Sequence, residues 1–329
     1  MTERTRGALV ASIATTIADY RRGEIPTPDA DHVERWISQF DASVQEPMLA
    51  ELDHVLGKTY VSRTDGEKFI SGILTAEKLA GANPGDFWKK ANFLNIQEGG
   101  NSQREMLAMF DVVLQRSCGV ALDECGSDDG PYIYLDDIIF TGNRVKNDLL
   151  GWIQSSAPLA AKVHVLVIGF HRGGQWYAKT KVEEGAKAAG KTVDVSWWRY
   201  LEIEDRKAYI ADSDVLRPSS LPNDAATQTY AQSLKYPPVL RLGNSAGGRG
   251  FFSSDASRNL LEQELLKAGV YIRSICPNLN VYQRPLGNMV LQTLGFGALI
   301  VTFRNCANNC PLAFWADDPW YPLFPRKTN

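Results

Sequence analysis

The chain lacks any apolar run long enough to cross a membrane. No stretch of about 18 apolar residues occurs in its 329 residues, whereas a transmembrane helix needs about 20. The first apolar patch, in "MTERTRGALVASIATTIADYRRGEIP", is followed by Asp19, Arg21 and Arg22 and has no clear small-residue cleavage site. This pattern favours an amphipathic helix over a signal peptide. We therefore expect no membrane association and a cytoplasmic location.

Cysteine and histidine are also scarce, and positive charge is not in excess. The five cysteines have no framework spacing, which suits a reducing compartment. Cys306 and Cys310 are four residues apart with no second pair and no nearby histidine, which argues against a zinc site. The four histidines offer little material for a histidine-based mechanism. A net charge of −3 gives no global basic field, so nucleic-acid binding is not expected.

The pattern of apolar residues predicts three regions. Residues 1–90 show helical spacing, as in "DADHVERWISQFDASVQEPMLAELDHVL", and form a predicted N-terminal helical region. In residues 91–215 the strand-like runs "YIYLDD", "KVHVLVIGF" and "TVDVSWWRY" alternate with helical segments. This order predicts an α/β core with a parallel sheet. Residues 216–329 are predicted as an α+β extension packed on the core, with "YIRSI" and "FGALIVTF" as strands and a helix that ends at Gly269.

Two adjacent acids stand where the first of these strands is predicted to end. Asp136 and Asp137 close the run "YIYLDD", and Thr141 and Gly142 follow just before a helix. Ligands of parallel α/β sheets bind at the carboxyl ends of strands. Backbone N–H groups and a helix N-terminus suit a phosphate, and paired carboxylates suit ribose hydroxyls or Mg²⁺. The residues alone also allow a solvated strand end with an ordinary helix cap.

The segment "YLDDIIFTG" resembles the phosphoribosyl pyrophosphate loop of type I phosphoribosyltransferases. The resemblance implies that Asp136 and Asp137 hold ribose hydroxyls and that Thr141 and Gly142 begin the 5′-phosphate cradle. It also implies Mg²⁺ as cofactor and a nucleotide or phosphoribosyl pyrophosphate as ligand. Asn143 and Arg144 depart from the usual Gly-Thr of this family. Arg144 could either add a charge to the cradle or fill it.

A second loop, "NIQEGGNSQRE", is the candidate pyrophosphate site that such enzymes carry after an earlier strand. Glycines permit close backbone approach, and hydroxyl, amide and guanidinium groups follow them. The alternative is a plain helix N-terminus capped by Asn101 or Ser102. The candidate ligands in this loop are Gly99, Gly100, Ser102, Gln103 and Arg104.

The segment "GFHRGGQW" follows the next predicted strand and should reach the same edge of the sheet. His171 and Arg172 could touch a base or a phosphate there, or have a neutral surface role. Near the C-terminus, aromatic residues could form a base-stacking pocket or a lid that belongs to the core. These residues are Trp315, Trp320, Tyr321 and Phe324.

Nearly the whole chain resembles a group of bacterial phosphoribosyltransferase-like proteins associated with conflict or antiphage-defence gene sets. The resembling pieces include "FWKKANFLNIQEGGNSQREML", "SRNLLEQELLKAG" and "RPLGNMVLQTLGFGALIVTFRNCANNCPLAFWAD". The group implies a type I phosphoribosyltransferase-like core with extra terminal elements, and protein partners from the same gene set.

Three functions remain open from the sequence. The first is transfer or cleavage of a phosphoribosyl group with Mg²⁺, which needs positioning and charge stabilisation rather than a covalent nucleophile. The second, favoured by Asn143 and Arg144, is a non-catalytic nucleotide sensor or a regulatory subunit of a defence system. The third is nucleic-acid processing, for which Arg241, Arg249 and Arg258 could form a local basic patch.

Overall fold

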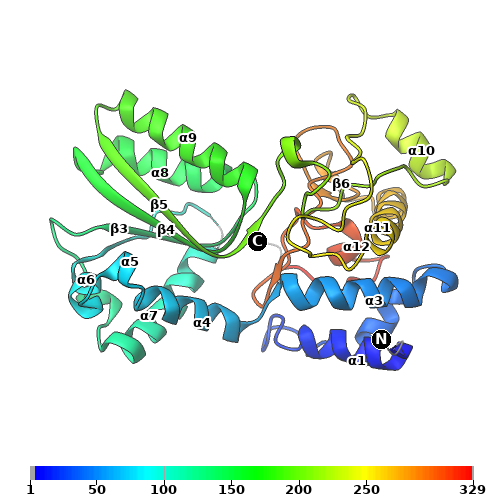
Figure 1. Cartoon of the computed structure of the whole chain (residues 1–329), viewed down its shortest axis with the longest axis horizontal. Helices are drawn as coiled ribbons and strands as arrows, with labels where there is room; N and C mark the ends of the chain where they lie inside the picture. Colours follow the sequence, from blue (N-terminus) through cyan, green and yellow to red (C-terminus); the bar gives the residue numbers. More distant parts are fainter. Residues whose placement is uncertain (1–3, 100, 328–329) are drawn as a thin grey trace. The chain divides into compact units, whose positions relative to one another are not determined.

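The computed structural model describes residues 4–99 and 101–327, and they form two compact units (Figure 1). The chain passes from one unit to the other after Arg63 and again after Ile203. One unit is therefore continuous, and the other combines the N-terminal and C-terminal parts of the chain. These crossing points differ from residues 90 and 215, the predicted domain boundaries, which stay a prediction about independently folding regions.

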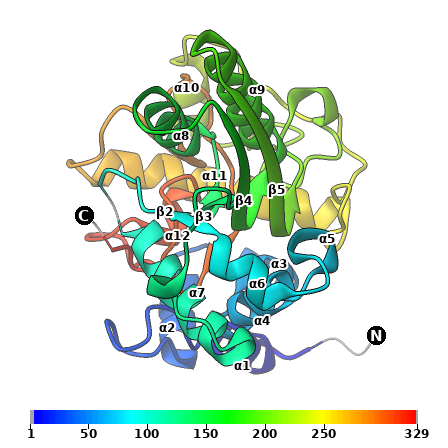
Figure 2. The same ribbon diagram turned by 90° about the vertical axis from the view of Figure 1, so that its left-hand side faces the viewer.

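The continuous unit, Thr64–Ile203, is built on a parallel sheet in the order β2-β3-β4-β5. Helices α8 and α9 cover one face of this sheet, and α4 and α7 lie on the other (Figures 1 and 2). The mixed α/β architecture predicted from the sequence is thus confirmed. In chain order the elements are α4 (Arg63–Leu74), α5 (Glu77–Ala80), α6 (Pro84–Lys90), β2 (Asn92–Leu94), α7 (Ser102–Cys118), β3 (Tyr132–Ile139), α8 (Asn143–Ser155), β4 (Ala160–His171), α9 (Arg172–Ala188) and β5 (Thr192–Ile203).

The sheet forms at these positions because its central strands are apolar on both faces. In β4 every residue from Val163 to His171 is buried, as expected for a parallel strand between two helical layers. Helix α8 packs Val145, Leu149 and Trp152 into the same core as β3 and β4. Their helical spacing puts them on one face of α8. The sheet is therefore a rigid support for the loops at its edge.

The other unit joins both ends of the sequence. Trp36 Nε1 donates to the carbonyl of Ala313 at 2.7 Å, and β1 pairs in parallel with β8. Its helices and strands are α1 (Arg6–Thr16), α2 (Ala30–Ile37), α3 (Ala42–Thr59), β1 (Tyr60–Val61), α10 (Ala225–Gln232), α11 (Asp255–Ile275), β6 (Gln283–Arg284), β7 (Gly287–Asn288), β8 (Val301–Thr302) and α12 (Leu312–Trp315). Among the described residues, no helix has the length and apolar character needed to cross a membrane.

Of the two strands predicted in the C-terminal region, one is a helix and the other is much shorter than expected. The segment "YIRSI" belongs to α11, and "FGALIVTF" contributes only the two residues of β8. Helix α11 does not end at Gly269, as predicted, but continues to Ile275. The role of this glycine is close packing. A Cβ at Gly269 would lie 2.5 Å from the carbonyl oxygen of Pro285, so its absence lets the β6–β7 hairpin approach the helix.

The C-terminal aromatic residues lie in the core of this unit. Trp315, Trp320 and Phe324 are buried, and the ring of Phe324 meets Tyr20 edge to face at 5.1 Å. Tyr321 is half-buried and its hydroxyl lies 2.7 Å from Nδ1 of His32. The structure therefore favours the lid interpretation of this segment over a base-stacking pocket.

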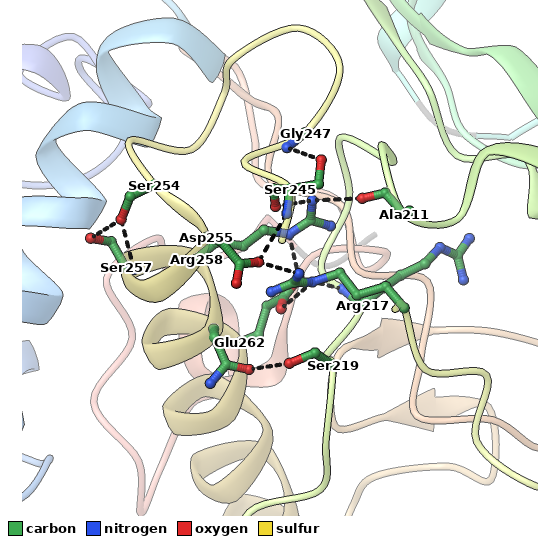
Figure 3. A network of polar contacts seen from close by, with 12 residues as sticks. Ala211, Arg217, Ser219, Ser245, Gly247, Ser254, Asp255, Ser257, Arg258 and Glu262 are labelled. Carbon is green, nitrogen blue, oxygen red and sulfur yellow. Dashed lines mark hydrogen bonds and ion pairs between the residues drawn. The ribbon is translucent and has the colours of Figure 1, made fainter. Parts of the chain in front are cut away.

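A buried charge network holds the segments around α11 together (Figure 3). Glu262 is fully buried and accepts from Arg258 Nε at 2.8 Å and from Arg241 Nε at 3.1 Å. Arg241 also donates to the carboxylate of Asp255. Glu262 accepts a further hydrogen bond from the backbone N–H of Arg217 at 2.8 Å. The side chains of Arg241 and Arg258 are completely buried. They therefore do not contribute to a basic surface patch of the kind the nucleic-acid hypothesis required.

Removing the charge of Glu262 should strongly destabilise the protein. Glu262→Gln leaves Arg241 and Arg258 without this shared counter-charge, and breaking a buried pair costs about 3–5 kcal/mol. Urea unfolding followed by circular dichroism measures the change. Glu34→Gln is the control, because Glu34 pairs with Arg6 in a half-exposed site and should cost less than about 1 kcal/mol. Equal effects of the two substitutions would contradict the assigned role of Glu262.

Candidate functional site

The carboxyl end of β3 extends beyond its neighbour β2. Leu94, the last residue of β2, pairs with Tyr134, whereas β3 continues to Ile139, which pairs with Phe170 of β4. The strand therefore does not end at the two aspartates, as the sequence predicted, but two residues later. Beyond the end of β2, Leu135 and Asp136 of β3 are hydrogen-bonded to Gln103 and Gln97, which follow β2 in the chain. This arrangement brings the two predicted ligand loops to the same edge of the sheet.

Asp136 is buried and is hydrogen-bonded to its own strand and to the loop after β2. Its Oδ1 accepts the backbone N–H of Asp137 at 2.9 Å, and Gln97 Nε2 lies 3.4 Å from its Oδ2. Only 5% of Asp136 is exposed. Asp136 thus links β3 to the loop after β2 through the side chain of Gln97. The sequence analysis did not identify Gln97 as part of the site.

Asp137 is the more accessible acid of the pair. It is half-buried, and its Oδ1 accepts the backbone N–H of Ile138 at 2.7 Å. Successive side chains of a strand point to opposite faces of the sheet, so the two aspartates do not act as one symmetrical pair. Of the two, Asp137 is better placed to meet a ligand from solvent.

The turn after β3 passes very close to the start of α9. A Cβ at Gly142 would lie 2.1 Å from the carbonyl oxygen of Gly174, and a Cβ at Gly174 would lie 1.9 Å from that of Phe140. Gly142 also has φ +76°, which L-residues with a side chain rarely adopt. Two glycines are therefore required for this turn to deliver Thr141, which is exposed, to the N-terminus of α8.

Arg144 joins the two loops. Its Nη1 donates to the carbonyl oxygens of Glu98 and Gly99, each at 2.9 Å. Asn143 is exposed, and its backbone and side-chain nitrogens lie 3.5 and 3.4 Å from Thr141 Oγ1. The residues that depart from the family pattern thus organise the turn and tie it to the second loop.

The loop after β2 is held from inside by Gln103. This residue is buried, its Oε1 accepts from the backbone nitrogens of Ile96 and Gln97 at 2.8 and 2.9 Å, and its Nε2 donates to the carbonyl of Leu135 at 3.2 Å. Ser102 Oγ donates to Gln97 Oε1 at 2.9 Å. Gln103 is therefore placed to support the loop rather than to reach outward.

The remaining predicted residues of this loop differ in exposure. Arg104 is exposed and donates to Asn101 Oδ1 at 2.6 Å, so the side chain of Asn101 does not cap α7. Gly99 is exposed and has φ +74°. Gly100, predicted alongside it, lies outside the described residues.

His171 and Arg172 have different environments although they are adjacent. His171 is fully buried, its Nδ1 lies 3.1 Å from the carbonyl of Ile139, and its ring stacks on Phe140. Arg172 is partly exposed and pairs with Glu202 at 3.0 Å. His171 therefore supports the turn after β3, while Arg172 lies at the surface of the same edge.

A tyrosine and a further acid complete the polar groups near β3. Tyr134 donates its hydroxyl to Asp148 Oδ2 of α8 at 2.7 Å. Burial, and then the nearby charges of Asp136 and Asp148, raise the pKa of Tyr134 well above its usual value, so it stays a proton donor. Burial also raises the pKa of Asp148, and Arg144 partly opposes this shift. The spacing of Tyr134 and Asp148 in the sequence did not indicate that they pair, because their contact depends on how α8 packs on β3.

The acids at this edge are too few to coordinate a magnesium ion without ligands from a bound molecule. Among residues 4–99 and 101–327, no group of three or more His, Cys, Asp or Glu side chains could hold a metal ion. Mg²⁺, however, usually keeps several waters and is bound through one or two carboxylates together with substrate phosphates. Of the two acids, the half-buried Asp137 is the one whose exposure fits such an ion arriving with a phosphorylated ligand, whereas Asp136 is buried.

Comparison with known families shows the family to which the chain belongs. A family model described as PRTase-CE, a phosphoribosyltransferase-like family, matches residues 33–326, well over half of the chain. The chain belongs to this family. The PRTase-CE match covers both units, and it includes the loops after β2 and β3. Searches of curated proteins and of solved structures each found no match.

Adding one methyl group at Gly142 should disrupt the turn of this PRTase-CE member. Gly142→Ala combines backbone strain with overpacking against Gly174, which should cost about 2–4 kcal/mol. Gly151→Ala is the control: Gly151 lies inside α8, and apart from the neighbouring residues and backbone of its own helix no atom lies within 4 Å of an added Cβ, so stability should rise by up to about 1 kcal/mol. Thermal and urea unfolding of both variants test this, and a Gly142→Ala protein as stable as wild type would refute the close approach.

Proposed function

We propose that the loops after β2 and β3 bind a phosphoribosyl or nucleotide ligand. In this proposal Asp137, with Asp136 behind it, binds ribose hydroxyls. Thr141, Gly142 and Asn143 surround the 5′-phosphate at the N-terminus of α8. The observation that carries the proposal is the direct link between the two loops through Arg144 with Glu98 and Gly99. Gln97 also ties the loop after β2 to Asp136 in strand β3. The family match supports a ligand of this class.

The second loop is proposed to hold the pyrophosphate end of such a ligand. Gly99, Gly100, Ser102 and Arg104 supply backbone N–H groups, a hydroxyl and a cation. Arg172 supplies a further cation at the same sheet edge. Gln103 and His171 act from behind as positioning residues, because both are buried.

Phosphoribosyl transfer is the reaction that this arrangement supports best. The bond from the anomeric carbon to pyrophosphate breaks, and a bond from that carbon to an acceptor forms. Mg²⁺ held with the pyrophosphate and ribose hydroxyls would neutralise charge on the leaving group. The protein contributes positioning and electrostatic stabilisation, which explains why no nucleophile–base pair is needed.

Loss of the accessible acid should weaken binding of phosphoribosyl pyrophosphate. A carboxylate that accepts hydrogen bonds is worth about 1.5–3 kcal/mol, so Asp137→Asn should raise Kd roughly ten- to a hundredfold. Isothermal calorimetry with Mg²⁺, and again with EDTA, measures this. The double variant Asp136→Asn with Asp137→Asn should abolish both binding and pyrophosphate release.

Asp194→Asn is the matched control, because Asp194 is on β5 of the same sheet and outside both loops. It should bind phosphoribosyl pyrophosphate as wild type does. If wild-type protein gives no heat with phosphoribosyl pyrophosphate or any nucleotide, the proposed ligand class is wrong.

A non-catalytic nucleotide sensor is the second candidate. The observation that favours it is Arg144, whose guanidinium donates to backbone carbonyls of the second loop. It stands where type I phosphoribosyltransferases, which this loop resembles, usually carry threonine. A sensor should show saturable nucleotide binding that is lost in Thr141→Ala with Arg144→Ala, and no pyrophosphate release with any nucleobase. Measured release from wild type would exclude it.

A role in bacterial antiphage defence, in the cytoplasm and with partner proteins from the same gene set, is part of the same proposal. It rests on the resemblance of the whole chain and on no contact within the structure. Plating phage on cells that carry the complete gene set, with wild-type or doubly substituted Asp136 and Asp137, tests it. Equal plating efficiency in both strains would contradict a defence role of this site.

A further inference from the structure

The unit that combines the two ends of the chain contains a pocket away from the loops discussed above. Its cavity has a volume of about 170 Å³, close to the roughly 150 Å³ of an engineered apolar cavity that binds benzene, so it suits a ligand with a single ring. Its walls are mostly aliphatic and aromatic, with a few polar groups. The residues used below are Leu216, Leu286, Leu294, Phe296, Arg217 and Lys207.

The floor of the pocket is fixed by backbone hydrogen bonds. Leu216 N donates to Gly297 O at 2.8 Å, and Leu286 N donates to Leu294 O at 2.8 Å. Gly295 and Gly297 have positive φ, and a Cβ at either position would lie 2.5 Å from backbone atoms of Leu286 or Leu216. The pocket is therefore formed before any ligand arrives, which lowers the entropy cost of binding.

Arg217 is held at the wall of the pocket with part of its hydrogen-bonding capacity unused. Its Nη2 donates to the carbonyl of Asp205 at 2.7 Å, and its backbone N–H donates to Glu262 at 2.8 Å. Its Nε is buried and has no hydrogen-bond partner. The guanidinium charge is therefore only partly compensated by hydrogen bonds, and an anion bound close to it would be stabilised electrostatically.

The charges around the pocket favour an anion. Arg217 and Lys207 line it together with one acid, Asp205. Lys207 is exposed and belongs to no ion pair among the described residues. Burial lowers the pKa of the Arg217 guanidinium, and Asp205 partly opposes this shift. Because arginine remains protonated in proteins near neutral pH, the positive charge at the wall stays in place.

We propose that this pocket binds a small aromatic anion. The carboxylate or phosphate of the ligand is held by Arg217 and Lys207, and its flat apolar body lies between Leu216, Leu286, Leu294 and Phe296. Aliphatic walls with few polar groups suit a flat apolar ring, and a guanidinium offers paired N–H donors to a carboxylate or phosphate. This site is independent of the proposed phosphoribosyl ligand, since its residues come from the other unit.

Ligand-observed ¹⁹F NMR of the full-length protein tests the pocket with two probes, 4-fluorobenzoate and 4-fluorophenyl phosphate. At least one anion should show saturable line broadening, and neutral 4-fluorobenzamide should bind at least tenfold more weakly. Arg217→Gln should weaken anion binding about ten- to a hundredfold, the range for loss of a charge-assisted hydrogen bond.

Filling the pocket provides a test that does not depend on Arg217. Met289 lines the pocket, so Met289→Trp should abolish the broadening. Val290 is 71% exposed and does not line the pocket. Val290→Trp therefore adds the same side chain at the adjacent position, outside the pocket, and should leave binding intact. Circular dichroism confirms that both variants are folded.

Excess phosphoribosyl pyrophosphate separates this site from the loops after β2 and β3. Broadening that persists in its presence supports the pocket, and competition would overturn the assignment. The proposal is also overturned if neither anion binds saturably, if 4-fluorobenzamide binds equally well, or if Met289→Trp and Val290→Trp behave alike.

Discussion

The close approach of Gly142 and Gly174 is the constraint on which the candidate site depends. It lets the turn after β3 pass within backbone contact of the first turn of α9. Because α9 follows β4 without an intervening loop, this contact fixes the turn relative to two neighbouring strands at once. The position of Thr141 and the start of α8 follow from it, and any larger side chain would push the turn away from the sheet.

A second layer of contacts makes the loops after β2 and β3 one structure. Because β2 is short, the end of β3 has no strand neighbour on the β2 side. Hydrogen bonds from side chains hold this part of β3 in place of strand pairing. Gln103 bonds to the backbone of Leu135, while Gln97 reaches Asp136. Arg144, at the start of α8, donates to backbone carbonyls of the loop after β2. A phosphate that attracted this guanidinium would therefore act on both loops together, which is a physical route from ligand binding to a change in loop structure.

The other unit is stabilised in a different way. Its core contains charged side chains, and Glu262 offsets the burial of two arginines. Such a network is expensive to desolvate and is retained only with good geometry. Here it orders the segments near residues 215 and 245 around α11, and these include the segment that carries Arg217. The network thus fixes one wall of the pocket proposed to bind an aromatic anion.

The sequence by itself determined the α/β alternation, because apolar runs and helical spacing depend on near neighbours in the chain. It also singled out "YLDDIIFTG" and the glycine-rich loop, whose motifs are local. It did not determine that Asp136 is buried and Asp137 half-exposed, that Gln103 and His171 face inward, or that "YIRSI" continues a helix. Only the tertiary structure decided these points, since each depends on a partner distant in sequence: Gln97 for Asp136, Ile139 for His171, and Pro285 for the packing at Gly269.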